Sequence, residues 1–308
     1  MRTALVTGAT GFIGRHLVRR LREGGWRVVA AGGPETPPGE GLALDIRDCA
    51  ALLALIRAER PEVIHHLAGQ SLPALAFADS GPTLAANVLG TAALLEAARD
   101  SGVAPLVVVA CSGTAYGASL GQEAVREDAP LLPLTPYAVS KAAQDMLAFA
   151  AHRTGPVRTV RARIFNTTGP GKTGDVLNDL AGRVGALARS GVREGGLRVG
   201  NTASRRAILD VKDLAEALFL LGEAGEAAAG EAFNIGAPEA ETVASLIHRL
   251  QSVSGIALRP EPDPALFRPA DEPLLLGDTA RICALTGWKP RISLDSTIRR
   301  IYETVLLN

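Results

Sequence analysis

The chain has 308 residues, 47% of them hydrophobic and 21% charged, which is ordinary for a globular enzyme with two lobes or with one large α/β domain and an appendage. Lysine plus arginine equals aspartate plus glutamate at 32 each, so no overall field attracts nucleic acid or an anionic membrane. The three cysteines lack metal-ligand spacing, and their small odd number predicts neither a metal site nor a disulfide framework. The amino terminus has no signal-like apolar run, and no segment approaches ~20 uninterrupted apolar residues. We therefore expect a cytoplasmic protein without a membrane span.

Short apolar runs and helical periodicity alternate over the first half of the chain. Each predicted strand is followed by a predicted helix, and the helices begin near residues 12, 49, 83 and 137. The predicted strands are 3–7, 26–31, 62–69, 104–112 and 157–166. This alternation predicts a doubly wound parallel sheet of the Rossmann type.

After Asn166 the alternation stops. Residues 167–207 are rich in glycine and basic residues, 208–236 return a helix and a strand, and the tail holds a helix at 242–255, a proline-rich stretch at 259–273 and a final helix. The sequence therefore predicts a dinucleotide-binding domain (1–165 plus 208–236) and a smaller α/β substrate-binding lobe (166–207 plus 237–308). That lobe would lie over the carboxyl edge of the sheet, where ligands bind in such folds.

A glycine-rich turn follows the first predicted strand and opens the first helix. Gly8 permits the tight turn, Gly11 lets backbone amides approach a diphosphate, and Gly14 allows close packing of helix on sheet. The positive end of the helix dipole adds to the attraction for an anion. Because any tight strand–helix turn favours glycine, the motif indicates a dinucleotide site only in this βαβ context.

The end of the second predicted strand bears on the choice of cofactor. It continues "VVAAGGPE", so no acid is available for a ribose 2′-hydroxyl before Glu35, although no arginine is present to hold a 2′-phosphate either. Arg15 either reaches that phosphate or is an exposed helix residue. This pattern favours NADP(H) over NAD(H). Further along, Asp45 is predicted to contact the adenine and Asp48 to cap the next helix.

Tyr137 precedes Lys141 by one helical turn, so both side chains can point to one cleft. An ammonium about 4 Å from a phenolate would stabilise it by about 4 kcal/mol at an effective dielectric near 20, so we expect Lys141 to lower the pKa of Tyr137. Ser112 and Thr114, at the end of the most apolar strand, could orient a substrate oxygen. The alternatives are an exposed Tyr–Lys pair and simple strand-end capping.

Motifs along nearly the whole chain together resemble the extended short-chain dehydrogenases/reductases that modify nucleotide sugars. They are "TGATGFIG", "LDIRD", "HLAGQS", "NVLGT", "YAVSK", "RIFNTTGPG", "SRRAILDVKDLAEA", "FNIG" and "RPADEPLLLGD". The resemblance implies a catalytic set of Ser112, Tyr137 and Lys141, with Lys141 also binding the nicotinamide ribose. It implies cofactor contacts at Gly8, Gly11, Phe12, Ile13, Gly14, Asp45, Ile46, Leu67, Ala68, Tyr137 and Lys141, and substrate contacts at Ser112, Thr114, Asn166, Arg206 and Arg268.

The resemblance also bears on the reaction. Family members that dehydrate the sugar carry acids where this chain has Gly113 and Thr114, so the pattern favours NAD(P)H-dependent reduction of the C4 ketone of a GDP-linked 4-keto-6-deoxyhexose. Several reductases have glutamate in place of Thr114, and Ala207 and Ile208 also depart from the usual motif. A UDP-sugar 4-epimerase is the alternative enzyme, and a non-catalytic NADP sensor is disfavoured because Tyr137 and Lys141 are both present. Family members pair through helices near 83–100 and 137–153, which predicts a homodimer with a four-helix bundle.

Overall fold

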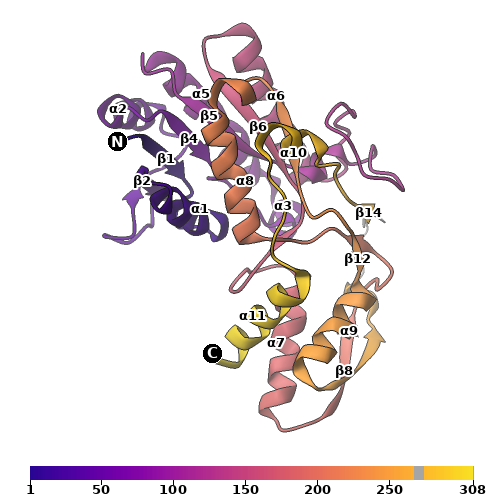
Figure 1. Ribbon diagram of the computed structural model, residues 1–308. Coiled ribbons are helices and arrows are strands. Elements are labelled where there is room, and N and C mark those ends of the chain that lie inside the picture. Colours follow the sequence, from indigo (N-terminus) through magenta and orange to yellow (C-terminus); the bar gives the residue numbers. More distant parts are fainter. Residues whose placement is uncertain (267–273, 308) are drawn as a thin grey trace.

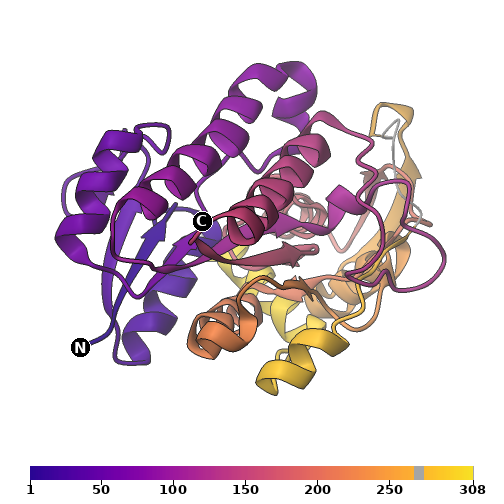
Figure 2. The same cartoon turned by 90° about the horizontal axis from the view of Figure 1, so that it is seen from above.

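The structure, a computed structural model, describes residues 1–266 and 274–307. Its centre is a seven-stranded parallel sheet in the order β11-β6-β5-β4-β1-β2-β3 (Figures 1 and 2). The chain therefore reverses its direction of strand addition between β1 and β4, which creates a crevice at the carboxyl edge. The strands are β1 (Thr3–Thr7), β2 (Arg27–Gly32), β3 (Leu42–Ala43), β4 (Val63–His66), β5 (Leu106–Ser112), β6 (Arg158–Ile164) and β11 (Ala232–Ile235).

Helices cover both faces of this sheet, which confirms the predicted Rossmann-type fold. Helices α1 and α8 pack against one another on one face, whereas α2, α5 and α6 cover the other (Figure 2). No helix among the described residues has the length and apolar character needed to cross a membrane. The helices around the sheet are α1 (Phe12–Glu23), α2 (Cys49–Glu59), α3 (Pro73–Ala78), α4 (Ser80–Leu84), the π-helix η1 (Ala85–Leu89), α5 (Gly90–Asp100), the 3₁₀ turn η2 (Gly113–Tyr116), α6 (Pro136–Thr154), α8 (Val211–Ala224), η3 (Gly225–Ala228) and α10 (Ala280–Thr286).

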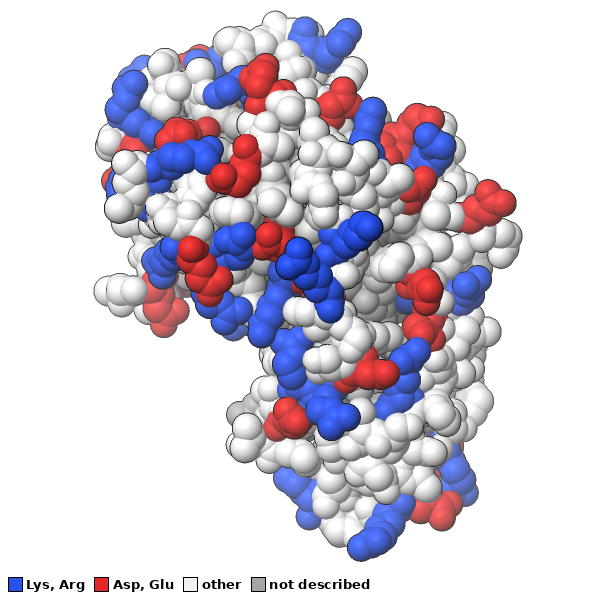
Figure 3. Space-filling model, in the orientation of Figure 1, with Lys and Arg blue, Asp and Glu red and all other residues white. Residues whose placement is uncertain are grey.

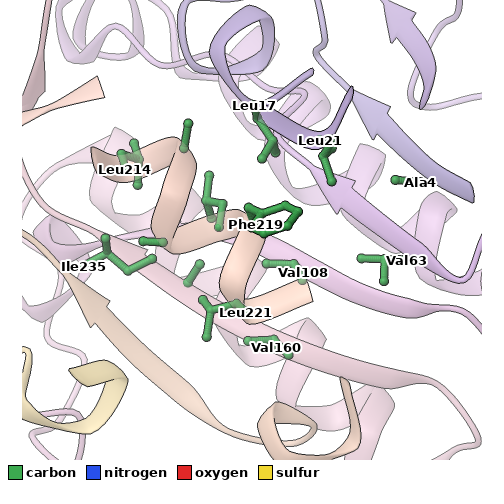
Figure 4. Close-up of a cluster of buried hydrophobic side chains, with 14 of the residues drawn as sticks. Ala4, Leu17, Leu21, Val63, Val108, Val160, Leu214, Phe219, Leu221 and Ile235 are labelled. Carbon is green, nitrogen blue, oxygen red and sulfur yellow. The ribbon is translucent and has the colours of Figure 1, made fainter. Parts of the chain in front are cut away.

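Alternate residues of each central strand face opposite helical layers. In β5, Val108 belongs to the cluster beneath α1 and α8, whereas Val107 and Val109 belong to the cluster beneath α2 and α5. Figure 4 shows the first of these clusters, to which Phe219 of α8 also belongs. Because strands buried on both faces need apolar residues at every position, β5 is the most apolar strand of the sequence. Each fully buried side chain of this size contributes roughly 1.5–3 kcal/mol.

A second set of elements lies below the sheet in Figure 1 and has its own hydrophobic cluster, shared by α7, β8, α9, β13 and α11. Its strands β8 and β13 pair in parallel. Three short strands form a separate sheet in the order β12-β9-β14. The elements are β7 (Thr167–Thr168), α7 (Val176–Arg189), β8 (Glu194–Val199), β9 (Arg205–Arg206), β10 (Leu209–Asp210), β12 (Glu241–Thr242), α9 (Val243–Ser254), β13 (Ala257–Pro262), η4 (Pro264–Leu266), β14 (Leu274–Leu275) and α11 (Leu294–Leu307).

Regular elements that the sequence analysis did not assign individually occur within 167–207 and in the proline-rich stretch. Helix α7 begins at its N-cap Asp175, whose side chain accepts from the Asn178 amide, and it buries Leu177, Leu180 and Val184. Glycines at positions 182 and 185 interrupt its pattern, although the cap at Asp175 is readable in the sequence. Strand β13 includes two prolines, which a strand tolerates at a sheet edge.

Asp210 joins the two parts of the fold. Its buried carboxylate caps α8 by accepting from the Lys212 amide at 2.9 Å. It also accepts from the Thr297 hydroxyl at 2.7 Å and pairs with Arg300, both on α11. One carboxylate therefore holds the terminal helix against the start of α8.

We predict that Asp210→Ala lowers the free energy of unfolding by about 2–4 kcal/mol, because a helix cap and two further hydrogen bonds to a buried charge are lost together. Asp100→Asn, in an exposed pair with Arg99, should leave the stability close to that of the wild type. Urea denaturation followed by circular dichroism measures both. Equal effects of the two substitutions would show that Asp210 does not join the parts.

Candidate active site

The glycine-rich turn has the geometry of an anion site. Gly8 has φ +70°, and a Cβ added there would lie 2.7 Å from the amide nitrogen of Ala68. A Cβ at Gly14 would collide with the Gly8 carbonyl oxygen, so helix and strand approach as closely as the sequence predicted. Helix α1 starts after Gly11 with no side-chain cap and no acid in its first turn. Its first amides at Phe12 and Ile13 therefore fit a dinucleotide diphosphate.

Two residues predicted to bind the cofactor border this turn. The backbone of Leu67 and Ala68, just after β4, lies directly against Gly8, and the Ala68 amide donates to the Thr7 hydroxyl at 3.3 Å. Ile46, which follows β3, packs instead on Gly90 at the start of α5.

The end of β2 differs from the expectation in one respect. Glu35 folds back so that its carboxylate oxygen is 2.7 Å from the position of a Cβ on Gly33. An acid therefore lies close to the end of β2, although the strand itself carries none. The sequence identified Glu35 as the first acid after this strand, and the turn at 33–36, in which the Thr36 amide donates to the Gly33 carbonyl, brings its side chain back to Gly33.

The two aspartates after β3 have separate environments. Asp48 is the N-cap of α2 and accepts from the Ala51 amide at 2.9 Å, as predicted. Asp45 pairs with Arg47 at 2.6 Å, and the hydrogen bond from Arg47 lowers the pKa of Asp45 to about 2. Contact between Asp45 and an adenine remains a prediction.

Ser112, Tyr137 and Lys141 lie together at the carboxyl edge of the sheet. Ser112 ends β5, and its hydroxyl lies 2.9 Å from that of Thr114 and hydrogen-bonds the Tyr137 phenol. Thr135 caps α6 by accepting from the Ala138 amide, which fixes the start of the helix that carries Tyr137 and Lys141. The buried Lys141 ammonium donates to the Ala110 carbonyl at 3.0 Å.

The expected effect of Lys141 on Tyr137 is wrong for this structure. The ammonium lies 6.0 Å from the centre of the phenol ring, and no hydrogen bond joins the two side chains among the described contacts. Burial raises the pKa of Tyr137 to about 12, and the hydrogen bond with Ser112 only partly opposes it. Burial also lowers the pKa of Lys141 to about 8. Desolvation outweighs the attraction that spacing alone suggested.

A buried hydrogen-bonded chain connects the catalytic helix to the glycine-rich strand. His66 bonds Thr7 at 2.9 Å through Nδ1 and Thr91 at 3.0 Å through Nε2, and Gln144 of α6 donates to Thr91 at 2.7 Å. A neighbouring branch runs through Asn87, which donates to the Ser140 hydroxyl at 2.9 Å. Sequence analysis missed this chain, because its members look like ordinary core positions on four separate elements.

A second buried network holds the turn that follows Ser112. Arg163 of β6 bonds both carboxylate oxygens of Asp145 at 2.8 and 3.0 Å and donates to the Tyr116 phenol at 2.8 Å. The phenol donates in turn to Asn234 of β11. An arginine within a buried strand was the sequence signal for this network, because a buried charge requires partners.

The residues predicted to contact the nucleotide diphosphate lie beyond β6 in the sequence. The side-chain amide of Asn166 has a buried nitrogen with no hydrogen-bond partner among the described residues, which makes it available to a ligand. Arg206 lies on β9, whose partner β14 begins at Leu274. Arg268, the other predicted diphosphate ligand, lies outside the described residues.

Comparisons with known proteins agree with this geometry. Residues 4–236 match the model of the NAD dependent epimerase/dehydratase family. This chain belongs to that family. It is 33% identical to GDP-6-deoxy-D-mannose reductase of Pseudomonas aeruginosa over 96% of this chain and 94% of the relative, and 30% identical to UDP-glucose 4-epimerase of Mycolicibacterium smegmatis over 98% of each. The solved structure of RMD from Pseudomonas aeruginosa complexed with NADPH superposes with a TM-score of 0.86 at 30% identity, covering 100% of this chain and 99% of that one.

Family membership confirms the prediction of an NAD(P)-dependent enzyme built on this fold. A nicotinamide dinucleotide fits the uncapped amino terminus of α1 and the glycines that approach it. The comparisons include both a reductase and an epimerase, so they leave the reaction open.

We predict that the Tyr137 phenol ionises near pH 12. Its pKa lies above the value of about 10 for an unfolded tyrosine, so its contribution to stability is present below about pH 10 and is lost as the pH rises through about 12. Absorbance at 295 nm after rapid pH jumps, compared between the wild type and Tyr137→Phe, isolates this group. A step below pH 9 in the difference curve would instead indicate a phenol acidified by Lys141.

Proposed function

We propose that the protein reduces the C4 ketone of a GDP-linked 4-keto-6-deoxyhexose, such as GDP-4-keto-6-deoxy-mannose, to GDP-rhamnose or its C4 epimer. The observation that carries this proposal is the cluster of Ser112, Tyr137 and Lys141, together with Gly113 and Thr114 at the positions where dehydrating relatives carry acids. Without a carboxylate there, no base is placed to take a C5 proton. The similarity to a GDP-6-deoxy-D-mannose reductase points to the same reaction.

In this proposal Tyr137 is the general acid. A reduced nicotinamide held at this site would supply the hydride for C4, and the Tyr137 hydroxyl would give its proton to the ketone oxygen. Its raised pKa keeps the phenol protonated throughout the physiological range, so the acid form needs no prior activation. Ser112 and Thr114 hold the ketone oxygen by hydrogen bonds. Lys141 holds the nicotinamide ribose and supplies positive charge as the phenol loses its proton.

The nucleotide diphosphate would be bound by Asn166, Arg206 and Arg268 in the smaller lobe (166–207 plus 237–308). Asn166 supports this assignment through its buried amide nitrogen, which has no hydrogen-bond partner in the described parts of the chain. Arginine suits a diphosphate because its planar guanidinium can donate two parallel hydrogen bonds. The dinucleotide-binding domain would then comprise 1–165 plus 208–236.

The proposed cofactor is NADP(H). No acid occupies β2 itself, and a solved relative binds NADPH. The carboxylate of Glu35 close to Gly33 weakens this preference, because an acid in that place favours a free ribose 2′-hydroxyl. Arg15 on the first turns of α1 is the cation available to offset it.

A UDP-sugar 4-epimerase is the second candidate, because such an enzyme of Mycolicibacterium smegmatis is 30% identical over 98% of this chain. The two activities differ in their use of the cofactor. An epimerase regenerates its dinucleotide in every cycle, whereas a reductase consumes one NADPH per product. Interconversion of UDP-glucose and UDP-galactose without net oxidation would favour the epimerase.

The proposal also includes a cytoplasmic homodimer formed through α4, α5 and α6. Three apolar side chains of α6 with helical spacing, Val139, Met146 and Phe149, are about half exposed at 45%, 57% and 47%. Leu84 and Leu89, just before α5, are exposed as well. A contiguous apolar surface of this kind is typical of a protein interface, and a four-helix bundle with a second copy would bury it.

We predict that Tyr137→Phe lowers kcat for NADPH-dependent reduction of GDP-4-keto-6-deoxy-mannose at least about 100-fold, because the proton donor is lost. The NADPH dissociation constant should stay within a few-fold. Tyr302→Phe is the matched control, since Tyr302 is buried in α11, among the side chains of the smaller hydrophobic cluster. Steady-state rates of NADPH oxidation at 340 nm give kcat for both variants. Undiminished turnover of Tyr137→Phe would remove Tyr137 from the reaction.

Arg206→Ala should raise KM for the nucleotide sugar about ten- to a hundred-fold with little change in kcat, because the diphosphate is held equally in the ground and transition states. Arg205→Ala is the matched control, since the more exposed Arg205 is the adjacent residue of the same strand. If both substitutions had the same effect on KM, or if Arg206→Ala weakened NADPH binding instead, the diphosphate assignment would be wrong.

A further inference from the structure

Residues 169–174, named here the strap, lie against both loops that border the cofactor crevice. At one end, a Cβ on Gly169 would be 3.4 Å from the ring of Phe12, the first residue of α1. At the other, a Cβ on Gly174 would be 2.8 Å from the side chain of Leu72, in the loop after β4. Because β1 and β4 are neighbours on either side of the topological switch, the strap spans the crevice between them.

The two ends of the strap are tied to one another. The Thr168 hydroxyl donates to Asp175 at 2.6 Å, and the Asn178 side chain donates to the Gly169 carbonyl at 3.1 Å. Gly171 and Gly174 have φ values of +78° and +72°, so the strap bends where other residues would be strained. The strap is therefore a closed loop on a fixed base rather than an open connection.

Lys172 is the one charged residue on the strap. Its side chain is partly buried, its ammonium donates to the Thr167 carbonyl, and its nitrogen lies 5.7 Å from the centre of the Phe12 ring. The Arg15 guanidinium lies 5.7 Å from the same ring. Figure 3 shows Lys and Arg side chains gathered where α1 and the lower end of α8 lie in Figure 1.

Among the described residues, Asp175 is the acid that acts on the Lys172 ammonium, and its carboxylate already accepts hydrogen bonds from Thr168 and Asn178. Burial lowers the pKa of Lys172, which shows that holding the ammonium here costs free energy. The first turn of α1 contains no acid and adds the positive end of a helix dipole. An anion at this place would offset each of these costs.

We propose that Lys172 is a cofactor-binding residue whose ammonium meets the diphosphate of the dinucleotide, and that the strap closes over the bound cofactor. The inference rests on the nicotinamide cofactor of the proposed function and extends its site beyond the glycine-rich turn. The cofactor diphosphate is favoured over that of the nucleotide sugar, because Lys172 lies against the residue that opens α1. The proposed sugar-diphosphate ligand Arg206 belongs instead to β9.

The test is direct binding of NADPH, followed by its fluorescence, to the full-length protein at two salt concentrations. Lys172→Gln removes the charge but keeps a donor for the Thr167 carbonyl, and we expect it to weaken NADPH binding about tenfold at low salt. We also expect a smaller loss of affinity on adding salt than in the wild type. Lys172→Arg should restore most of the affinity. Lys289→Gln, the same change of charge at an exposed position before α11, should bind as the wild type does.

Binding of GDP to the same variants separates the two diphosphates and needs no activity. An unchanged GDP dissociation constant beside weakened NADPH binding supports the proposal. NADPH binding within twofold of the wild type, or a loss confined to GDP, would overturn it.

If Lys172→Gln lowers the melting temperature, the variant Leu72→Ala provides a second test. It frees one end of the strap without a change of charge and should speed NADPH release, whereas an unchanged rate counts against closure. Because these readouts use no sugar ketone, their failure is distinct from failure of the proposed reduction.

Discussion

The active site depends on a line of buried hydrogen bonds that fixes α6 against the strand of the glycine-rich turn. Thr7, His66, Thr91 and Gln144 come from β1, β4, α5 and α6, and each is essentially excluded from water. A buried polar group without a partner costs about 1–3 kcal/mol, so the four elements have one favourable arrangement. That arrangement sets the distance between the start of α1, where a diphosphate fits, and the helix that carries Tyr137.

The pKa values of Tyr137 and Lys141 are set by the burial of the two side chains and not by their spacing along α6. An ammonium one helical turn from a phenol suggested an acidified tyrosine, but the Lys141 ammonium bonds the Ala110 carbonyl instead. Removal of both groups from water favours the neutral form of each, which raises the pKa of Tyr137 and lowers that of Lys141. A phenol that stays protonated is suited to give a proton. Reduction of a ketone, which consumes one, therefore agrees with the site better than removal of a proton from carbon.

The sequence predicted the features that are set by residues close along the chain. It missed the features that depend on contacts between residues far apart in the sequence. The strand positions, the close packing at Gly8 and Gly14 and the Asp48 cap follow from residues close along the chain, and the structure confirms them. The joining role of Asp210 needs tertiary contacts that no local pattern contains. Helix α7 had a readable cap at Asp175, but its glycines and the basic residues around it obscured the apolar spacing. The polar network around His66 was invisible because its members are distant in sequence.

The central claim is that hydride from a reduced nicotinamide ends on C4 of a GDP-linked keto sugar. It is tested most directly by incubating the protein with GDP-4-keto-6-deoxy-mannose and NADPH deuterated at the transferable position, and by locating the label in the product by NMR. The account predicts deuterium at C4, one NADPH oxidised per product, and an unlabelled C5. A sugar interconverted with no net loss of NADPH, or label exchanged at C5, would contradict it.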